Sequence, residues 1–454
     1  MDKFNEYFYN TLNIISKNLT NIKSPIADHN SYFNNNWNKY NNEIIILFTS
    51  MFNILDKIFV DMNQIDLKKN QKNITRWTNI NHDLPFCYLL NKKKQDTNTS
   101  KQYNKILFKE FNEMYNKRKI KLRNNDYTNI IKKYSNNLNH KIIQLLNYFQ
   151  TGSFVSLDVK LYTENNINIY EHYNFNHLEL HFFYNENINV IEKKNIINKI
   201  YIITKWIHSL NNKYKIKLIY FDTPLTKIIN KSDNFLSSQN VNSGSSSSNI
   251  FIMIWRREEF TKVLIHELIH YLDLDVKYDD SFNNIINYQL GNLNFPVIIN
   301  ETITEIQAQL LHTIFISFIK GKTFNKSFDY FKTLYNYELI YSLYQFSKIM
   351  NFYSIKEFNE KNLTEKFNQT SNVFSYYILK SILTLNFGDI LFELNHMKQF
   401  DKNNKLICDV NQCLVLSKYI KKQLKHIPIE LLNKIIRELK LNDNSLKMTI
   451  CNIF

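Results

Sequence analysis

Residues 260–272 read FTKVLIHELIHYL and contain, from His266 to His270, the pentapeptide HELIH. The side chains around these polar residues are mostly apolar, which predicts a buried α-helix. Residues four apart share one face of a helix, so both imidazoles can bind one metal ion from the same side. Glu267 follows the first histidine directly, where its carboxylate can reach a water molecule on that ion. The stretch therefore predicts a zinc site suited to hydrolysis.

A second interpretation of this helix needs no metal. A buried helix tolerates polar side chains only when they are hydrogen-bonded or charge-paired. Histidines that bond to backbone groups would also meet this requirement. We favour the metal because two histidines and a glutamate at these three positions match a metal-binding motif with a clear mechanism.

A catalytic zinc ion usually has three protein ligands and one open position, so a third ligand is needed. Residues 295–311 read FPVIINETITEIQAQLL and predict a second, mostly buried helix. Pro296 suits its first turn and Gly321 its end. Glu301 and Glu305 are four apart and share one face. Two carboxylates on an otherwise apolar helix need cationic or metal partners, so this helix is the best source of the third ligand.

The two motifs together resemble those of a known family. HExxH at 266–270, followed on a second helix by NExxTE at 300–305, is similar to the gluzincin, or thermolysin-like, branch of the zincin metallopeptidases. The resemblance covers residues 260–311. The chain also looks similar to uncharacterised zincin-like proteins of large DNA viruses, which implies a viral protein.

The resemblance implies a role for each polar residue of the motifs. His266, His270 and Glu301 would bind one Zn²⁺ per chain. Glu267 would be the general base and acid. Glu305 would orient His266 by accepting its second ring N–H, as groups behind metal-binding histidines commonly do.

The sequence departs from the family pattern in two ways. The gap between His270 and Glu301 is 300 − 270 = 30 residues, longer than in thermolysin-like enzymes. We expect the extra length to form a loop from Asp273 to Asn292. In addition, Glu305 stands where the family usually has aspartate, and its longer side chain can shift the geometry behind the ligand.

Other zincin patterns offer rival third ligands. The metzincin pattern HExxHxxGxxH fails, because Asp273 replaces its glycine and Val276 its histidine. An aspartate-zincin arrangement through Asp275, Asp279 or Asp280 stays open, although a solvated acidic loop is the commoner meaning of such a run.

Three further histidines are not expected to bind this metal. His312 shares the face of the two glutamates but lies about 16 Å beyond Glu301 along a helix, so it is expected to be a satisfied core residue. His177 and His181 are four apart on a predicted strand, which separates them by about 13 Å. We interpret them as sheet residues.

Composition carries less information than the motifs. The chain has 454 residues with only 5 Gly and 5 Pro, and it is rich in Asn, Ile, Lys, Tyr and Phe, a bias typical of AT-rich genomes. Its formal net charge of +16 would suit a polyanionic partner such as nucleic acid. However, the lysines are spread along the chain, so codon bias is the favoured explanation over a binding role.

The cysteines, the N-terminus and the hydropathy of the sequence predict a cytoplasmic protein, or a protein of the virion or the host cytoplasm if it is viral. The four cysteines are widely scattered and are expected to be reduced thiols: Cys87, Cys408, Cys413 and Cys451. The N-terminus lacks the features of a signal peptide. Residues 43–60 are apolar but include Asp56 and Lys57, so no membrane span is expected.

The pattern along the chain predicts an α+β fold. Residues 1–145 are expected to form a helical N-terminal region, 146–320 a zincin-like catalytic lobe, and 321–454 a helical lobe that closes the cleft. The catalytic lobe would have a mixed four-stranded sheet, with strands at 155–162, 177–184, 214–221 and 249–255. A helix is predicted at 190–210. Helices of the last lobe are predicted at 328–350, 373–385, 388–397 and 429–439.

Substrate contacts are suggested by the resemblance. Residues 249–255 would be the strand at the edge of the cleft that pairs with an extended peptide, with Phe251 and Met253 as contacts. Residues 244–248 read GSSSS and could instead be a disordered surface loop before that strand. The helical lobe would supply a group that stabilises the oxyanion. The candidates are Tyr376 and Tyr377, with Tyr335, Tyr337 and Tyr341 equally available.

These patterns predict a zinc-dependent metallopeptidase that hydrolyses peptide bonds in a peptide or protein substrate. The alternative is a non-catalytic zincin-fold scaffold, or a polyanion-binding or virion-associated protein, with a structural or relict metal site.

Overall fold

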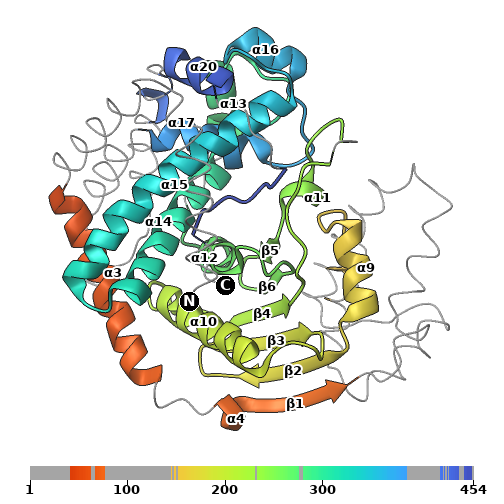
Figure 1. The fold of residues 1–454 in the computed structure, drawn as a ribbon, viewed down its shortest axis with the longest axis vertical. Helices are drawn as coiled ribbons and strands as arrows, with labels where there is room; N and C mark the ends of the chain where they lie inside the picture. Colours follow the sequence, from red (N-terminus) through yellow and green to blue (C-terminus); the bar gives the residue numbers. More distant parts are fainter. Residues whose placement is uncertain are drawn as a thin grey trace.

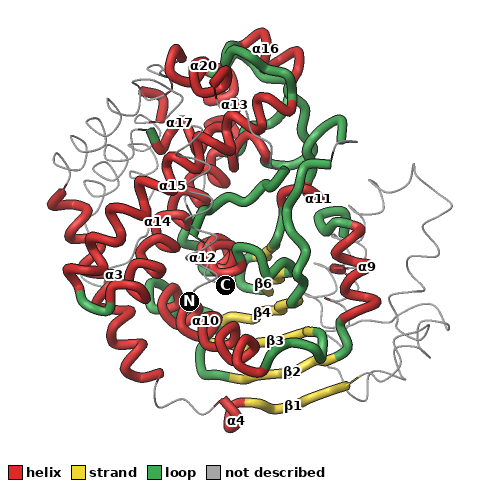
Figure 2. Tube along the Cα trace, in the orientation of Figure 1, coloured by secondary structure: helices red, strands yellow, loops and turns green. Residues whose placement is uncertain are grey.

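The computed structural model describes residues 41–62, 67–76, 152–230, 233–275, 280–385, 429–438 and 444–451, with a few single residues between them. These residues form a mixed α and β structure. Figure 2 shows a sheet in the lower part of the molecule, with most of the helices gathered above and to the left of it. The expected combination of helices and a mixed sheet is confirmed.

The sheet has six strands in the order β1-β2-β3-β4-β6-β5, stacked from bottom to top in Figure 1. Strands β3, β4 and β6 run parallel, and each of the other neighbouring pairs is antiparallel. The strands are β1 (Gln71–Arg76), β2 (Ile169–Asn174), β3 (Leu178–Tyr184), β4 (Ile216–Phe221), β5 (Gly244–Ser247) and β6 (Phe251–Ile254).

Three of the four predicted strands are confirmed as β3, β4 and β6, but the predicted count of four is wrong. Three strands were missed. Strand β1 lies in the region expected to be helical, and β2 has mixed polar and aromatic residues without clear alternation. Strand β5 is the serine-rich run GSSS, whose composition indicates a loop. Pairing with a neighbouring strand overrides this weak local preference.

The strand predicted at 155–162 is wrong, because residues Leu157–Asn166 form helix α9. Val155, Val159 and Thr163 are buried, at a spacing of four residues, whereas Leu157 is exposed. Alternation of polar and apolar letters indicated a strand, but the burial follows the period of a helix. Asp158 lies in the first turn of this helix, where a negative charge is favourable.

Helices α10 (Val190–His208) and α12 (Phe260–Tyr271) pack together in the larger hydrophobic core. Alternate strand residues, among them Leu180, Leu218 and Ile252, face the same core. The predicted helix at 190–210 is confirmed as α10. Farther from the sheet, α14 (Ile299–Gly321) packs along α15 (Phe324–Phe352) and against α12. The core therefore holds α12 between the sheet and α14.

The opposite face of the sheet has a second, smaller core. It contains Val155 and Val159 next to Phe221, Phe251 and Met253. Helix α9 thus packs on the face away from α12. Phe251 and Met253 are 2% and 0% exposed, so their predicted role as substrate contacts is wrong.

Residues 249–255 were predicted to be the edge strand, and this is wrong as well. Strand β6 lies between β4 and β5, which leaves β5 at the edge beside α12. The disordered loop considered for residues 244–248 is also wrong over Gly244–Ser247. The sheet continues one strand farther than expected beyond β6, so the serine run makes the edge strand on that side.

The remaining predicted helices agree with the structure where it describes them. Helix α15 confirms the prediction at 328–350, and the predictions at 373–385 and 429–439 match η2 with α17, and α20. The helix predicted at 388–397 lies outside the described residues. The other bounds are α3 (Asn41–Met62), α4 (Leu67–Asn70), α11 (Ser238–Val241), α13 (Asp280–Gln289), α16 (Glu360–Lys366), η2 (Phe374–Leu379), α17 (Lys380–Thr384) and α20 (Ile429–Glu438).

Two details around α14 differ from expectation. The loop predicted from Asp273 to Asn292 contains helix α13, and Val276 and Asp279 lie outside the described residues. Helix α14 begins at Ile299, so Pro296 precedes it rather than lying in its first turn. The predicted end at Gly321 is confirmed.

The start of α12 is fixed by the end of the chain. Glu259 precedes the helix with a positive φ of 58°, and its side chain is buried. Its Oε1 accepts hydrogen bonds from the backbone N–H groups of Met448 and Thr449, at 2.5 and 2.6 Å. Its Oε2 lies 2.9 Å from the ammonium of Lys227. These contacts join residues far apart in sequence and position the helix that carries HExxH.

Among the described residues, no helix is long and apolar enough to cross a membrane. The apolar run at 43–60 belongs to α3, which packs against α10 and α14. Cys451 is buried and free, and the other three cysteines lie outside the described residues.

Candidate metal centre

Helices α12 and α14 bring three side chains to one point. The Nε2 atoms of His266 and His270 each lie 3.5 Å from Oε2 of Glu301. All three donor atoms lie within 4.8 Å of one another. Side-chain exposures of 21% for His270 and 22% for Glu301 leave the cluster open to solvent on one side.

The donor atoms fit a zinc ion. Nitrogen and oxygen ligands about 2.0–2.2 Å from Zn²⁺ in a tetrahedron lie about 3.4 Å from each other. The observed nitrogen-to-oxygen distances are 3.5 Å, longer than a normal hydrogen bond. Nε2 of His270 is also buried without a hydrogen-bond partner. Two imidazole nitrogens and one carboxylate oxygen that converge at this spacing suit a cation.

Both imidazoles are oriented by carboxylates rather than by backbone groups. Nδ1 of His266 lies 3.0 Å from Oε2 of Glu305, in the position that the family resemblance implies. Nδ1 of His270 lies 3.2 Å from Oδ2 of Asp275. Each ring therefore presents Nε2 to the cluster and has Nδ1 paired behind it, the usual arrangement of metal-binding histidines.

Glu305 is itself held by two buried lysines. The ammonium of Lys262 forms an ion pair with Oε1 of Glu305, and Lys380 lies 3.7 Å from the same oxygen. All three side chains are almost fully buried. Lys262 and Lys380 with His266 keep the pKa of Glu305 well below its ordinary value, although burial alone would raise it. Glu305 thus stays ionised and can orient the imidazole of His266.

Asp275 was a rival third ligand, but it lies behind His270 rather than among the converging donor atoms. Its carboxylate contacts Nδ1, whereas Nε2 of the same ring faces Glu301. Asp280 is the first residue of α13, and Asp279 lies outside the described residues. Within the described part of the chain, the converging set at this site is His266, His270 and Glu301.

The electrostatics of the cluster favour ionised partners. Burial opposes the charged form of His270, but the bonds to Asp275 and Glu301 outweigh it and raise the pKa of His270 to about 10. The pKa of His266 is raised despite burial, by Glu301 and Glu305. The two histidines lower the pKa of Glu301 against the effect of its burial. The carboxylates of Asp275, Glu301 and Glu305 thus create a negative potential around the two imidazoles, which favours a positive charge at this place.

Glu267 lies beside the cluster on the side of the sheet edge. Burial raises the pKa of its carboxyl group, while the imidazoles of His266 and His270 and a hydrogen bond with Ser246 of β5 oppose the shift. Gly244 of β5 also lies against it, because a Cβ there would be 2.9 Å from Oε1 of Glu267 and 2.7 Å from Cγ1 of Val263. The strand therefore fixes the position of this carboxylate.

Of the five candidate tyrosines, the structure places Tyr376 at the cluster. Its hydroxyl donates to Oε2 of Glu301 at 3.2 Å, and its ring centre lies 6.0 Å from that of His266. It belongs to the π-helix η2, an uncommon element that often marks functional sites. The prediction for Tyr377 is wrong: this side chain is buried and its hydroxyl donates to the backbone oxygen of Leu446.

The remaining tyrosine candidates, Tyr335, Tyr337 and Tyr341, lie on α15, where they pack in or against the large core. His312 is buried and its Nε2 lies 2.9 Å from the hydroxyl of Thr261, so the expected core histidine is confirmed. Burial lowers its pKa to about 3, which keeps the ring neutral. His177 was expected to be a sheet residue, but it directly precedes β3, and its Nε2 lies 3.0 Å from the hydroxyl of Thr204 of α10.

Sequence reasoning missed four residues around the site: Asp275 in its orienting role, Ser246, Lys262 and Lys380. Lys262 gave a signal, because it lies one turn before His266, on the same face of a helix that is otherwise mostly apolar. A buried lysine needs an anionic partner, and Glu305 provides it. Ser246 and Lys380 gave no signal, because they reach the site only through strand pairing and packing between elements distant in sequence.

Comparison with known proteins gives limited information. No protein-family model and no solved structure matches the chain. The uncharacterised protein R210 of Acanthamoeba polyphaga mimivirus is 27% identical over 183 residues, which cover 38% of this chain and 44% of that protein. The chain is thus similar to a protein of a large DNA virus over less than half of either length, and this similarity suggests a viral origin.

Proposed function

We propose that the chain is a zinc-dependent metallopeptidase of the gluzincin type. The observation that carries the proposal is the convergence of His266, His270 and Glu301 beside the buried carboxylate of Glu267. A purely structural metal site needs no second carboxylate at this place, whereas hydrolysis needs a group that accepts and returns a proton.

The three converging residues would hold the ion, with a fourth position open on the solvent side. Zn²⁺ in such a site polarises the scissile carbonyl group and lowers the pKa of water. Glu267 takes the proton of the attacking water and later delivers it to the leaving amine. Its raised pKa suits this task, because a general base works best when its pKa approaches the working pH.

Other residues of the chain position the reacting groups. Glu305 and Asp275 keep the Nε2 atoms of the two histidines directed at the cluster. The partly buried Tyr376 presents its hydroxyl to Glu301, and burial with the nearby carboxylates keeps the pKa of this tyrosine well above the ordinary value. A neutral hydroxyl is a proton donor, so Tyr376 can stabilise an oxyanion that develops next to the cluster.

The substrate would bind as an extended peptide along β5. Among the described residues this strand is one of the two edge strands of the sheet, and a sheet edge can accept a peptide as an added strand. Because Ser246 of β5 also bonds to Glu267, a peptide on this edge would lie next to the general base. Backbone pairing along the edge favours peptide substrates without fixing a side-chain preference.

Metal binding tests the ligand set. His266→Ala, His270→Ala and Glu301→Ala should each remove zinc from this site, measured as metal bound to the purified, folded protein. Each substitution removes one direct bond to the ion. Retention of the same zinc content by both histidine variants would contradict the ligand assignment.

Hydrolysis tests the activity itself. Wild-type protein with bound zinc should cleave members of a broad peptide library, with products detected by mass spectrometry. The control is the same protein after the zinc is removed and then restored, which should abolish and recover cleavage. Zinc bound at His266 and His270 without any cleavage would favour the non-catalytic scaffold instead.

A further inference from the structure

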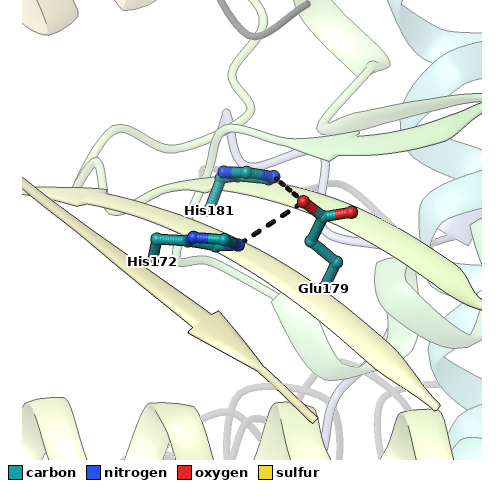
Figure 3. A group of neighbouring side chains, drawn as sticks. All are labelled: His172, Glu179 and His181. Atoms are coloured by element: carbon teal, nitrogen blue, oxygen red, sulfur yellow. Dashed lines mark ion pairs between the residues drawn. The ribbon is translucent and has the colours of Figure 1, made fainter. Parts of the chain in front are cut away.

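A second His–His–Glu cluster lies far from α12 along the sheet. His172 of β2 stands directly opposite His181 of β3 in the strand register. Glu179 precedes His181 by two residues on β3, so its side chain is on the same face. Figure 3 shows both imidazoles directed at the carboxylate of Glu179. Strands β4 and β6 separate these two strands from β5 and the first cluster.

The geometry repeats that of the first cluster. Nε2 of His172 and Nε2 of His181 each lie 3.4 Å from Oε1 of Glu179. These distances match the ligand-to-ligand spacing of about 3.4 Å around a tetrahedral zinc ion and are long for hydrogen bonds. Nε2 of His172 is buried without a hydrogen-bond partner. The three donor atoms lie within 4.8 Å of one another.

The two rings are held in place for binding. They stack with centres 4.7 Å apart and planes 3° from parallel, as expected for residues opposite each other on neighbouring strands. Nδ1 of His181 lies 2.9 Å from the hydroxyl of Tyr170. A ring that donates its Nδ1 proton to Tyr170 carries a free lone pair on Nε2, which is the form of histidine that binds metals.

A simple ion pair explains this arrangement less well. Two protonated imidazoles stacked with ring centres 4.7 Å apart would repel each other. With neutral rings that carry their proton on Nδ1, the form in which His181 donates to Tyr170, the lone pairs at Nε2 and at the carboxylate oxygen face each other. A cation between them removes this repulsion.

We propose that His172, Glu179 and His181 form a second metal site, which binds a divalent transition-metal ion of the zinc class. Two imidazoles and one carboxylate select such an ion over Ca²⁺ or Mg²⁺, which prefer oxygen ligands. Side-chain exposures of 17% for His172 and 30% for Glu179 give the ion access and leave one position to solvent. The bound ion would cross-link β2 to β3. The proposal is independent of the peptidase function.

The test is zinc binding to the full-length chain in which His266→Ala and His270→Ala have emptied the first site. This background should still bind about one equivalent of Zn²⁺ or of the probe Co²⁺, as one three-ligand site implies. Adding His172→Ala or His181→Ala should abolish that binding, and Glu179→Gln should weaken it. His177→Ala is the matched control and should keep it, because His177 faces Thr204 of α10 instead.

A thermal measurement guards against variants that fail to fold. Zn²⁺ should raise the melting temperature of the background protein, because a ligand that binds only the folded state stabilises it. This shift should disappear in His172→Ala, whose position is partly exposed and so tolerates truncation. The proposal is overturned if the background binds no zinc, or if binding and the thermal shift both survive His172→Ala.

If no zinc binds at His266 and His270 in the wild-type chain, the proposed peptidase function fails alone. The wild-type protein would then still bind about one equivalent through His172 and His181, as a single three-ligand site implies. The two failures are therefore distinguishable.

Discussion

The protein contains two clusters with the same three ligand types, one built on helices and one on strands. His266 and His270 lie one turn apart on α12 and meet Glu301 from α14, with 3.5 Å between nitrogen and oxygen. In the second cluster, His172 and His181 meet Glu179 across β2 and β3 at 3.4 Å. Helix periodicity and strand register thus produce nearly the same donor spacing.

The clusters differ in what stands behind and beside the ligands. In the helix cluster, carboxylates contact Nδ1 of both histidines, and the carboxylate of Glu267, which is not one of the three converging residues, lies next to them. In the strand cluster, His181 is backed by the neutral hydroxyl of Tyr170. The comparison separates the proposed metal binding from the proposed chemistry: both clusters have the three ligand types, but among the described residues only the helix cluster has a further carboxylate beside it that could act as a base.

The largest effect should come from removing that base. Glu267→Gln is nearly isosteric but cannot accept a proton, so it should lower peptide hydrolysis by about 100- to 10,000-fold. Zinc content and fold should stay as in the wild type, because the three ligands are intact. The helix cluster would then bind zinc without hydrolysing peptides, as we expect of the strand cluster. Peptidase activity near the wild-type value would show that another group is the base.

A substitution that displaces Glu267 without removing its carboxylate tests the same difference between the clusters with a smaller expected effect. Gly244→Ala places a methyl group 2.9 Å from Oε1 of Glu267 and 2.7 Å from Cγ1 of Val263, so both side chains, or the strand itself, must shift. Misplacing a catalytic group by about 1 Å costs up to about 100-fold in rate, so we expect a loss of about 10- to 100-fold in kcat. Zinc affinity should not change. An unaltered kcat would mean that contact with β5 does not position Glu267.

In the helix cluster a carboxylate lies at Nδ1 of each histidine. Asp275→Asn measures how much this negative charge contributes to zinc affinity. The substitution keeps the size of the side chain but removes the charge that faces Nδ1 of His270. Changes behind a metal ligand typically cost about 10- to 100-fold in metal affinity, which we expect here by zinc titration. Glu305→Gln should cost as much and also destabilise the fold, because Lys262 would keep a buried charge without its anion. Unchanged zinc affinity in Asp275→Asn would contradict the orienting role.

The sequence could predict the helix cluster because its information is local. His266, Glu267 and His270 are fixed by helix periodicity, and Glu301 and Glu305 by a second motif on another buried helix. Besides α12 and α14, three strands and four further helices were predicted for the same reason, since their patterns of apolar residues are strong. The end of α14 was predicted correctly at Gly321. Its start was predicted too early, because Pro296 precedes the helix, which begins at Ile299.

The rest depends on contacts between distant segments. The edge strand β5 has no strand-like composition and exists through pairing with β6, so 249–255 was taken for the edge. The strand cluster requires the register between β2 and β3, and β2 was not predicted. His181 was therefore compared with His177, four residues away, rather than with His172 across the strands. Single residues such as Tyr376 and Tyr377 could be separated only by the rotation of η2.

The smallest effect should come from removing the neutral hydroxyl group that contacts Nδ1 of His181 in the strand cluster. Tyr170→Phe removes the hydroxyl that lies 2.9 Å from Nδ1 of His181 and leaves the ring in the small core. A neutral hydrogen bond is weaker than one to a carboxylate, so the loss of zinc affinity should be about tenfold, at the low end for groups behind a metal ligand. The measurement is a zinc titration in the His266→Ala, His270→Ala background, with Asp275→Asn in the otherwise wild-type chain for comparison. A loss larger than that of Asp275→Asn would show that charge behind the imidazole is not what separates the two clusters. An equal loss would show that orientation of the ring matters more than its polarisation.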